Sequence, residues 1–233
     1  MAGVQLEHVV REYTMGRTTI RAVDDISFTI PEGKYTIILG ASGAGKSTVL
    51  NILGGMDSPT SGRVTVNGRE ISGFNKRQLT EYRRESIGFV FQFYNLMPNL
   101  TVLENVELAS QICKTPLDAR QVLAMVALGD RLNNFPAQCS GGEQQRGAIA
   151  RALAKNPDVL LCDEPTGALD YQTGKAILAL LYDLCKKSRK TVVVVTHNGA
   201  LAPTADVLIR MKSGKIESFE ENPSPVPVQE LEW

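Results

Sequence analysis

The feature that most constrains this chain is the glycine-rich stretch at residues 40–48. It matches the phosphate-loop pattern G-x-x-x-x-G-K-[ST] and consists of Gly40, Ala41, Ser42, Gly43, Ala44, Gly45, Lys46, Ser47 and Thr48. The apolar run at residues 35–39 predicts a buried parallel strand before it, and Val49, Ile52 and Leu53 predict a helix after it. A strand, a tight turn and a helix N-terminus aim backbone N–H groups and a positive dipole end at one point. This context favours a phosphate-binding loop over a glycine-rich turn that binds nothing.

Two side chains of this stretch are expected to meet the ligand. In phosphate loops the lysine, here Lys46, reaches the β- and γ-phosphates, and the hydroxyl of the next residue, here Ser47, ligates Mg²⁺.

The composition is that of an ordinary globular chain. Of 233 residues, 43% are hydrophobic and 21% charged, which permits a substantial core. The 25 Lys and Arg residues balance the 25 Asp and Glu residues, which argues against a nucleic-acid partner, since nucleic-acid-binding proteins present a basic face.

No apolar run approaches the roughly 18 residues needed to span a bilayer, and the N-terminus lacks the apolar core of a signal peptide. We therefore expect a cytosolic chain. Its widely spaced cysteines should be reduced and bind no metal; they are Cys113, Cys139, Cys162 and Cys185.

Apolar patterning predicts an α/β fold. Alternation over residues 4–30 predicts two antiparallel strands, joined near residues 15–17, at the edge of the sheet. Further strands are expected at residues 63–66, 86–91, 159–162 and 191–196 and in a hairpin over 207–216, with helical segments at 75–84, 101–137, 140–155 and 171–187. Strands that alternate with helices indicate a mostly parallel sheet with crossover helices. The helical stretch between Gln92 and Asn156 predicts an insertion. Residues 218–233 predict a tail with little to bury, ending in a frayed Trp233.

Polar side chains follow two of the predicted strands. Asp163 and Glu164 end the run at residues 159–162, and His197 ends the run at 191–196. The carboxyl ends of parallel strands are where open α/β sheets bind ligands. Asp163 suits a Mg²⁺ contact, and Glu164 is suited to orient or deprotonate a water. The phosphate loop favours these roles over solvated acids on a loop, and the shared edge favours a catalytic His197 over a structural one.

Two features leave alternatives open from the residues alone. Ser140 and Glu143 have the form of a capping box around Gly141 and Gly142. A well-capped helix is favoured here over an exposed N-terminus that holds an anion. Tyr13 is either an ordinary strand aromatic or a ring that stacks on a purine.

The order of these motifs resembles that of the ATP-binding-cassette (ABC) ATPases over roughly residues 4–217. The chain is similar above all to the subunits of macrolide-export, lipoprotein-release and bacitracin-resistance transporters, a narrower match carried by residues 86–106. The resemblance implies a phosphate-loop NTPase fold with a mostly parallel RecA-like core sheet, an antiparallel β edge subdomain and an inserted helical subdomain. It implies one nucleotide-binding domain over residues 1–217, with the helical insertion at about 93–156 and a tail at 218–233.

The resemblance also implies a Mg-ATP site. Tyr13 would stack on adenine, residues 40–48 would bind the phosphates, and Lys46 would take part in catalysis. Ser47, Gln92 and Asp163 would surround Mg²⁺. Glu164 would be the general base, and His197 would contact the γ-phosphate.

Dimerisation is implied too, with the same chain or a similar subunit, head to tail around two Mg-ATP. Ser140, Gly141, Gly142 and Glu143 would cap the γ-phosphate held by the opposite subunit, and Asp170 would lie at the dimer seam. Two departures from the family pattern are visible: Cys139 replaces an aliphatic residue, and Glu143 stands where many members have Gln. The Glu143 departure would place a carboxylate near phosphate, and the sequence leaves the orientation of this carboxylate open.

The expected function is ATP hydrolysis that drives a transmembrane permease. The permease would dock near the apolar residues 92–98, at the inner face of the membrane, and would export or extract a lipophilic or peptide substrate. One alternative is transmembrane signalling, for example control of cell-wall hydrolases. A second is a regulatory module without turnover, which the intact Glu164 and His197 disfavour. A third is a cassette acting on DNA or ribosomes, which usually carries coiled-coil insertions or tandem cassettes not found in this sequence.

Overall fold

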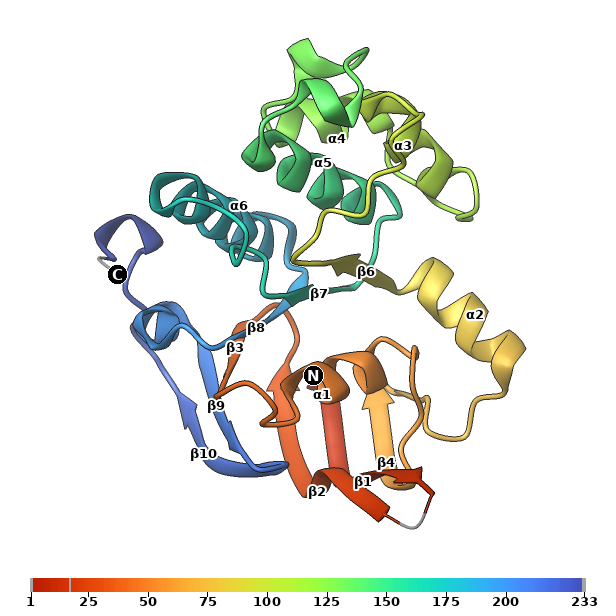
Figure 1. The fold of residues 1–233 in the computed structure, drawn as a ribbon, viewed down its shortest axis with the longest axis vertical. Coiled ribbons are helices and arrows are strands. Elements are labelled where there is room, and N and C mark those ends of the chain that lie inside the picture. The colour runs from red at the N-terminus through yellow and green to blue at the C-terminus, as the bar shows by residue number, and fades with distance from the viewer. Residues whose placement is uncertain (1, 17, 232–233) are drawn as a thin grey trace.

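The computed structural model describes residues 2–16 and 18–231, and within them a six-stranded sheet forms the centre of the fold (Figure 1). Its strands are β3 (Tyr35–Leu39), β6 (Ile87–Val90), β7 (Val159–Asp163), β8 (Thr191–Thr196), β9 (Val207–Lys212) and β10 (Lys215–Glu221). The spatial order is β10-β9-β3-β8-β7-β6. All neighbours pair in parallel except β10, which forms an antiparallel hairpin with β9. The predicted mostly parallel sheet and terminal hairpin are confirmed.

Both faces of this sheet are buried at its central strands β3, β8 and β7, which explains their continuous apolar sequences. Along β3, Ile37 packs into one core with helices, and Ile38 packs into a second core on the opposite face. Val194 and Val195 of β8 divide between the two cores in the same way. Successive side chains of a strand point to opposite faces, so a sheet covered on both sides needs apolar residues at every position.

The antiparallel strands form a sheet of their own. They are β1 (Ala2–Met15), β2 (Thr18–Pro31), β4 (Ser61–Val66) and β5 (Arg69–Glu70), in the order β2-β1-β4-β5. We expected the first two strands at the edge of the main sheet. Instead, β1 pairs with β2 on one side and β4 on the other, and these strands cover the main sheet through a shared core. Asn67 and Gly68 both have positive φ in the tight turn after β4.

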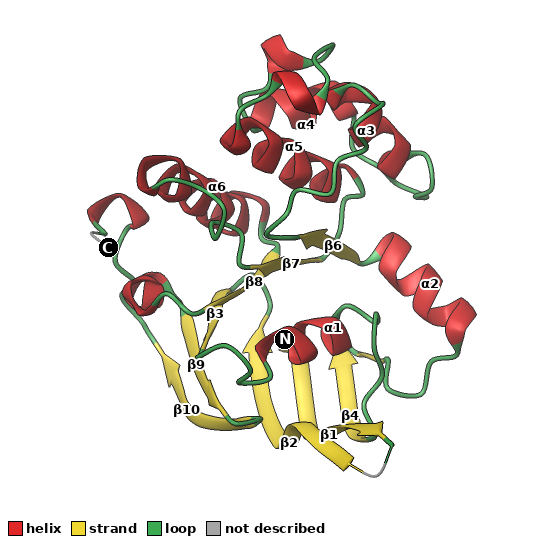
Figure 2. Cartoon of the chain, viewed as in Figure 1, coloured by secondary structure: helices red, strands yellow, loops and turns green. Residues whose placement is uncertain are grey.

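The helices surround the main sheet and build a separate lobe (Figure 2). Their bounds are α1 (Lys46–Leu53), α2 (Lys76–Glu85), α3 (Val102–Ser110), α4 (Ala119–Met125), α5 (Gly141–Ala154) and α6 (Tyr171–Ser188), and short 3₁₀ turns span Gly129–Arg131, Pro136–Gln138, Gly199–Thr204 and Val228–Glu230. Figure 1 shows α3, α4 and α5 together in the lobe that follows β6 and precedes β7. Asn75, Thr101 and Ser140 start their helices with complete capping boxes. No helix in the described ranges is long and apolar enough to cross a bilayer.

The C-terminal segment differs from the prediction. Strand β10 continues past residue 217 to Glu221, and Val228 and Leu231 are buried in the helical core. Tyr171 and Lys175 of α6 donate hydrogen bonds to the Leu231 carbonyl at 3.0 and 2.7 Å. The expectation that this segment has little to bury is therefore wrong, because two apolar side chains that follow its last proline, Pro227, pack beside α6. Trp233 lies outside the described residues, and the division into domains stays a prediction.

An ion pair with a buried carboxylate anchors the strand that leads into the phosphate loop. Asp206 is 4% exposed, and its carboxylate accepts a hydrogen bond from the backbone N–H of Tyr35 at 2.7 Å. The ammonium of Lys186 on α6 contacts both carboxylate oxygens, at 2.6 and 2.7 Å. These bonds raise the pKa of Lys186, although its partial burial acts in the opposite direction. Asp206 therefore ties the start of β3 to α6.

Replacing this carboxylate should destabilise the fold. Asp206→Ala should lower the free energy of unfolding by about 1–3 kcal/mol, because the buried Tyr35 N–H loses its acceptor. Urea denaturation followed by circular dichroism measures the loss. Asp183→Ala on the same helix is the matched control. It breaks an exposed pair with Lys187, which should cost only about 0.3–0.5 kcal/mol. Equal losses in the two variants would contradict the anchoring role of Asp206.

Candidate functional site

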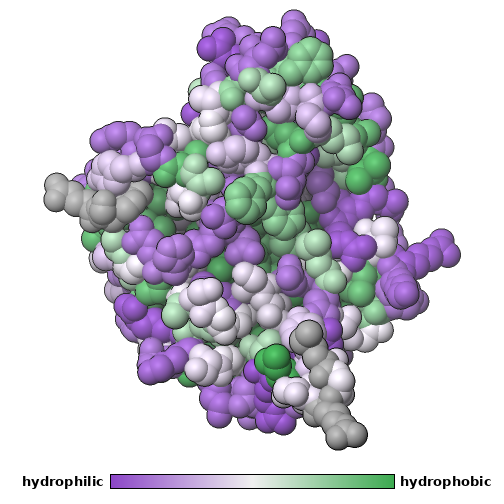
Figure 3. All heavy atoms as spheres, viewed as in Figure 1, coloured by the Kyte–Doolittle hydropathy of each residue, from purple (hydrophilic) through white to green (hydrophobic). Residues whose placement is uncertain are grey.

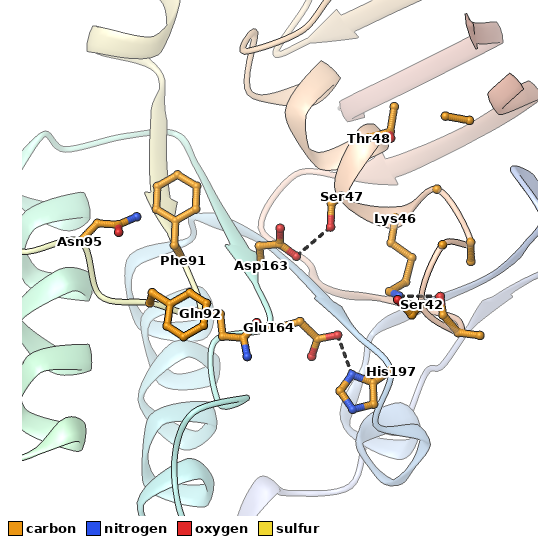
Figure 4. Close-up of a pocket in the computed structure, with 16 residues that line it drawn as sticks. Ser42, Lys46, Ser47, Thr48, Phe91, Gln92, Asn95, Asp163, Glu164 and His197 are labelled. Atoms are coloured by element: carbon orange, nitrogen blue, oxygen red, sulfur yellow. Dashed lines mark hydrogen bonds and ion pairs between the residues drawn. The ribbon is translucent and has the colours of Figure 1, made fainter. Parts of the chain in front are cut away.

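The parallel strands of the main sheet end at one edge, and the predicted site residues meet there (Figure 4). Leu39 at the end of β3 lies opposite Thr196 of β8, and Asp163 of β7 lies opposite Val195. The phosphate loop, Glu164 and His197 follow directly. This edge opens into a cavity of about 1040 Å³.

Most residues predicted for ATP and Mg²⁺ line this cavity. They are Ala41, Ser42, Gly43, Ala44, Gly45, Lys46, Ser47, Thr48, Gln92, Asp163, Glu164 and His197. Sequence reasoning missed Ala22 and Phe91, which also line it, and gave Phe93 and Asn95 only a place in the docking loop. Ala22 carries no chemical signal, because it reaches the cavity only through the packing of β2 against the phosphate loop.

Glycine is required at two points of the phosphate loop. Gly45 has φ 98°, and a Cβ there would lie 2.4 Å from the carbonyl oxygen of Ala22. At Gly40, a Cβ would lie 2.3 Å from the carbonyl oxygen of Met211. Any larger residue would therefore push the loop away from β2 and β9. Gly40 itself lines a neighbouring cavity of about 610 Å³ behind the loop.

Lys46 bends back over the phosphate loop. Its side chain is 7% exposed, and its Nζ donates hydrogen bonds to the carbonyls of Gly40 and Ala41 at 2.8 and 3.0 Å. The ammonium thus lies at the concave side of the loop, above the N-terminus of α1. Together, the loop and the lysine form a cradle for anionic oxygens.

Ser47 and Asp163 provide oxygen ligands from two neighbouring elements. The Ser47 hydroxyl donates to Asp163 Oδ1 at 3.2 Å, which brings α1 and β7 together across the cavity. Burial raises the pKa of Asp163 above its ordinary value, although the hydrogen bond from Ser47 opposes this shift. No cluster of three His, Cys, Asp or Glu in the described ranges could hold a metal by itself. The oxygen donors fit Mg²⁺, which is usually held by one or two carboxylates together with waters and substrate phosphates.

Glu164 adopts a strained conformation that turns its carboxylate toward His197. Its φ is 46°, and a left-handed conformation outside glycine costs about 1–3 kcal/mol. Glu164 Oε1 lies 2.8 Å from His197 Nδ1, and Oε2 accepts a hydrogen bond from the Thr196 hydroxyl at 3.0 Å. Figure 4 shows this pair opposite Lys46, with Gln92 entering from the side of β6. The carboxylate is therefore held at the cavity by two side chains from the end of β8.

Tyr13 does not line the cavity. Its hydroxyl donates to Asp57 Oδ2 at 2.6 Å, and the guanidinium carbon of Arg11 lies 4.6 Å from its ring centroid. Arg11 also pairs with Asp57 at 2.7 Å. Desolvation opposes the charge of this guanidinium, but its bonds to Tyr13 and Asp57 raise the pKa of Arg11 overall. One face of the tyrosine ring is thus covered, and the predicted adenine contact stays a prediction.

The Ser140–Glu143 motif lies on α5 and does not line the cavity of its own chain. Glu143 Oε2 accepts a hydrogen bond from the Ser140 N–H at 2.8 Å, and Oε1 accepts one from Arg131 Nε at 2.8 Å. The Arg131 bond, followed by the Ser140 bond, lowers the pKa of Glu143 to about 2. The carboxylate is therefore turned back onto its own helix and neutralised by Arg131. Sequence reasoning missed Arg131, because nothing in its local pattern marks it as a partner.

The first turn of α5 packs tightly against the start of α6. A Cβ on Gly142 would lie 2.3 Å from Thr173 Cγ2. Asp170 begins α6 by accepting the Thr173 N–H at 3.0 Å, and its bonds to the Thr173 side chain and backbone lower its pKa. Asp170 lies in a separate hollow of about 240 Å³, which Glu164 and His197 also line. The structure thus places Asp170 beside Glu164 and His197.

Comparison with known proteins places this geometry in a family. Residues 23–167 match the family model described as ABC transporter. An uncharacterized ABC transporter ATP-binding protein of Thermotoga maritima is 47% identical, over 93% of this chain and 94% of its own length. The macrolide export ATP-binding/permease protein MacB of Rhodopseudomonas palustris is 44% identical over 93% of this chain, which spans 34% of MacB.

Solved structures agree with the sequence relatives. An uncharacterized ABC transporter ATP-binding protein of Methanocaldococcus jannaschii is 44% identical over 94% of this chain and 97% of its own length. A dimeric structure of the cassette of this Methanocaldococcus protein has been solved in a post-hydrolysis state, bound to ADP and Pi. It superimposes on this chain with a TM-score of 0.85. The match covers 94% of this chain and 98% of the solved chain, at 43% sequence identity. The predicted ABC ATPase fold is confirmed.

Removing the Arg131 guanidinium should change the titration of Glu143. In Arg131→Met, the pKa of Glu143 should rise from about 2 toward the ordinary range of glutamate, because the charge-assisted hydrogen bond is gone. NMR titration of the glutamate carboxyl carbons measures it. A lowered folded-state pKa stabilises the fold above the ordinary pKa, and this stability is lost as the pH falls through about 2. In the variant, this contribution should be smaller and its loss should be complete at a higher pH. Arg120→Met, an exposed arginine on α4, should leave the Glu143 titration unchanged.

Proposed function

The chain belongs to the ABC transporter ATPase family, and on this premise we propose that the residues around the cavity bind Mg-ATP and direct water onto its γ-phosphate. The observation that carries this proposal is the convergence of three groups on one cavity. They are the phosphate loop with Lys46, the Ser47–Asp163 pair and the Glu164–His197 pair. Phosphoryl transfer depends on positioning and on neutralisation of charge, and this set of groups provides both.

The phosphate side of the site is cationic and polar. Lys46 and the backbone N–H groups of residues 41–48 bind the phosphate oxygens, as helix N-termini do in general. Ser47 and Asp163, with Gln92 beside them, hold Mg²⁺, which neutralises phosphate charge when bound. Gln92 packs against Gly167, where a Cβ would lie 2.9 Å from Gln92 Nε2. The absence of a side chain at Gly167 therefore leaves room for Gln92.

Glu164 is the general base of this proposal. It removes the proton from the attacking water, and His197 contacts the γ-phosphate. The two hydrogen bonds to the Glu164 carboxylate, from Thr196 and at His197, fix its direction before the substrate arrives. A base held in place in this way is worth about 10²–10⁴-fold in rate.

A second copy of the chain completes the site. Ser140, Gly141, Gly142 and Glu143 do not line the cavity of their own chain, so they are available to cap an ATP bound to a partner. The dimeric cassette with ADP and Pi in the structural relative supports this arrangement. Arg131 neutralises Glu143, which removes repulsion between this carboxylate and an approaching phosphate. Two chains, or this chain and a similar subunit, then pair head to tail around two Mg-ATP, with Asp170 at the seam.

The loop at residues 92–98 is the proposed docking site for a permease. Phe93 is 70% exposed and Met97 is 51% exposed, and exposed apolar groups of this kind mark interaction sites. Figure 3 shows hydrophobic residues gathered between the helical lobe and the body of the molecule. Arg151 of α5 donates hydrogen bonds to the carbonyls of Tyr94 and Asn95 and holds the loop to the lobe. Docking there would bring the chain to the inner face of the membrane.

Export or extraction of a lipophilic or peptide substrate is the transport reaction we propose. The support is the similarity to MacB of Rhodopseudomonas palustris, which is named as a macrolide export ATP-binding/permease protein. Signalling through the membrane partner would use the same ATPase cycle. Transport of a labelled macrolide or peptide into inverted vesicles that hold this chain and its permease distinguishes the two.

The role of Glu164 is tested by removing its basicity. Glu164→Gln should keep ATP affinity, measured with a fluorescent ATP analogue, because the phosphate contacts remain. Phosphate release should fall by about 10²–10⁴-fold. Glu81→Gln on α2, which breaks an exposed pair with Lys114, is the control and should turn over normally. Near-normal turnover in Glu164→Gln would remove Glu164 from the role of general base.

The docking site is tested at Met97, which does not line the cavity. Met97→Ala should weaken binding to the permease that co-purifies with this chain by at least about 1 kcal/mol, as loss of a buried anchor does. ATPase activity of the isolated chain should be unchanged. Met56→Ala removes an equally exposed methionine, 54% exposed, next to the C-terminal end of α1. Equal permease affinity in the two variants would place the docking site elsewhere.

A further inference from the structure

Gln145 lies where α5 meets the loops that carry two proposed site residues. Its side chain is completely buried, with 0% exposure. Its Nε2 donates hydrogen bonds to the Pro165 carbonyl at 2.7 Å and to the Phe91 carbonyl at 3.3 Å. Phe91 precedes Gln92, and Pro165 follows Glu164. One amide group therefore contacts the backbone beside both residues, which follow different strands.

The Glu164 backbone needs this kind of support. Its φ of 46° is unfavourable for a residue with a side chain, and the proline that follows further disfavours helical backbone conformations. Strained conformations persist only where the surrounding structure holds them. Backbone bonds from Glu164 N to the Val195 carbonyl and from Gly167 N to the Glu164 carbonyl, both at 3.0 Å, hold one side of the bend. The Gln145 amide bonds to the next carbonyl, at Pro165, from the side of α5.

We propose that Gln145 is a positioning residue for hydrolysis. Its amide group fixes the backbone at Phe91 and Pro165 and so places Gln92 and Glu164 relative to the first turn of α5. This inference rests on the proposed role of Glu164 as general base. Gln145 does not line the cavity, so it acts through Glu164 and Gln92 and does not touch the nucleotide.

The backbone around Gln145 requires N–H donors at this position. Two carbonyl oxygens face the side chain, and only a group with N–H donors can satisfy both. Methionine keeps a similar shape but donates no hydrogen bond. The neighbouring Gln144 has a different task, since its Nε2 donates to the Cys139 carbonyl at the start of its own helix, at 3.1 Å. Gln144 is therefore a matched control on the same helix.

The test compares Gln145→Met with Gln144→Met in the full chain. Gln145→Met should lower kcat by about 10²-fold, the order expected for a small misplacement of a catalytic group. Its affinity for a fluorescent ATP analogue should stay within about twofold of the unaltered chain, because no nucleotide contact is lost. Gln144→Met should keep its kcat. Gln145→Asn, which keeps the amide on a shorter side chain, should give an intermediate kcat. If Gln145→Met does not fold, Gln145→Asn takes its place in the comparison, with Gln144→Asn as its control.

A double variant separates this inference from the role of Glu164. In the Glu164→Gln background, Gln145→Met should lower phosphate release by much less than about 10²-fold, because the part of its effect that acts through Glu164 is already lost. A full additional loss would show that Gln145 does not act through Glu164, and equal kcat in the Gln145 and Gln144 variants would overturn the positioning role. Normal turnover in Glu164→Gln alone would instead overturn the general base, whatever Gln145 does.

Discussion

Parallel pairing of β3, β8, β7 and β6 is the constraint on which the rest of the structure depends. Parallel strands run in one direction, so the residues that follow them gather at one edge of the sheet. The register places Leu39 beside Thr196 and Asp163 beside Val195. The phosphate loop, the two acids and His197 thus meet because of backbone hydrogen bonding, although they are far apart in the sequence. The same pairing demands cover on both faces, which the helices and the antiparallel sheet provide.

Local strain and local charge are concentrated at this edge and are held by their surroundings. The phosphate loop approaches Ala22 and Met211 so closely that only glycine fits at Gly45 and Gly40. Glu164 keeps its unfavourable backbone conformation within a set of hydrogen bonds from neighbouring elements. At the start of α5, the hydrogen bond from Arg131 keeps the Glu143 carboxylate ionised and engages one of its oxygens. The close approach of the phosphate loop and the backbone conformation of Glu164 cost free energy locally, and both persist because the surrounding packing holds them.

Helix α5 connects parts of the molecule with different proposed tasks. Its first turn carries the residues proposed to cap a partner's ATP. Gln145, one turn later, holds the backbone beside Gln92 and Glu164, and Arg151 holds the exposed loop at residues 92–98. A displacement of this helix would therefore move Gln92, Glu164 and the loop at residues 92–98 together.

Neighbouring residues and periodicity were enough to predict the strands of the main sheet, the phosphate loop, the acids at the end of β7 and the capping box at Ser140. Tertiary structure was needed to place β1 and β2 with β4 in a separate sheet and Val228 and Leu231 beside α6. It alone paired Glu143 with Arg131, Tyr13 with Asp57, and Gln145 with Phe91 and Pro165. Such contacts join residues that no local pattern relates, since they arise only when separate elements pack against one another.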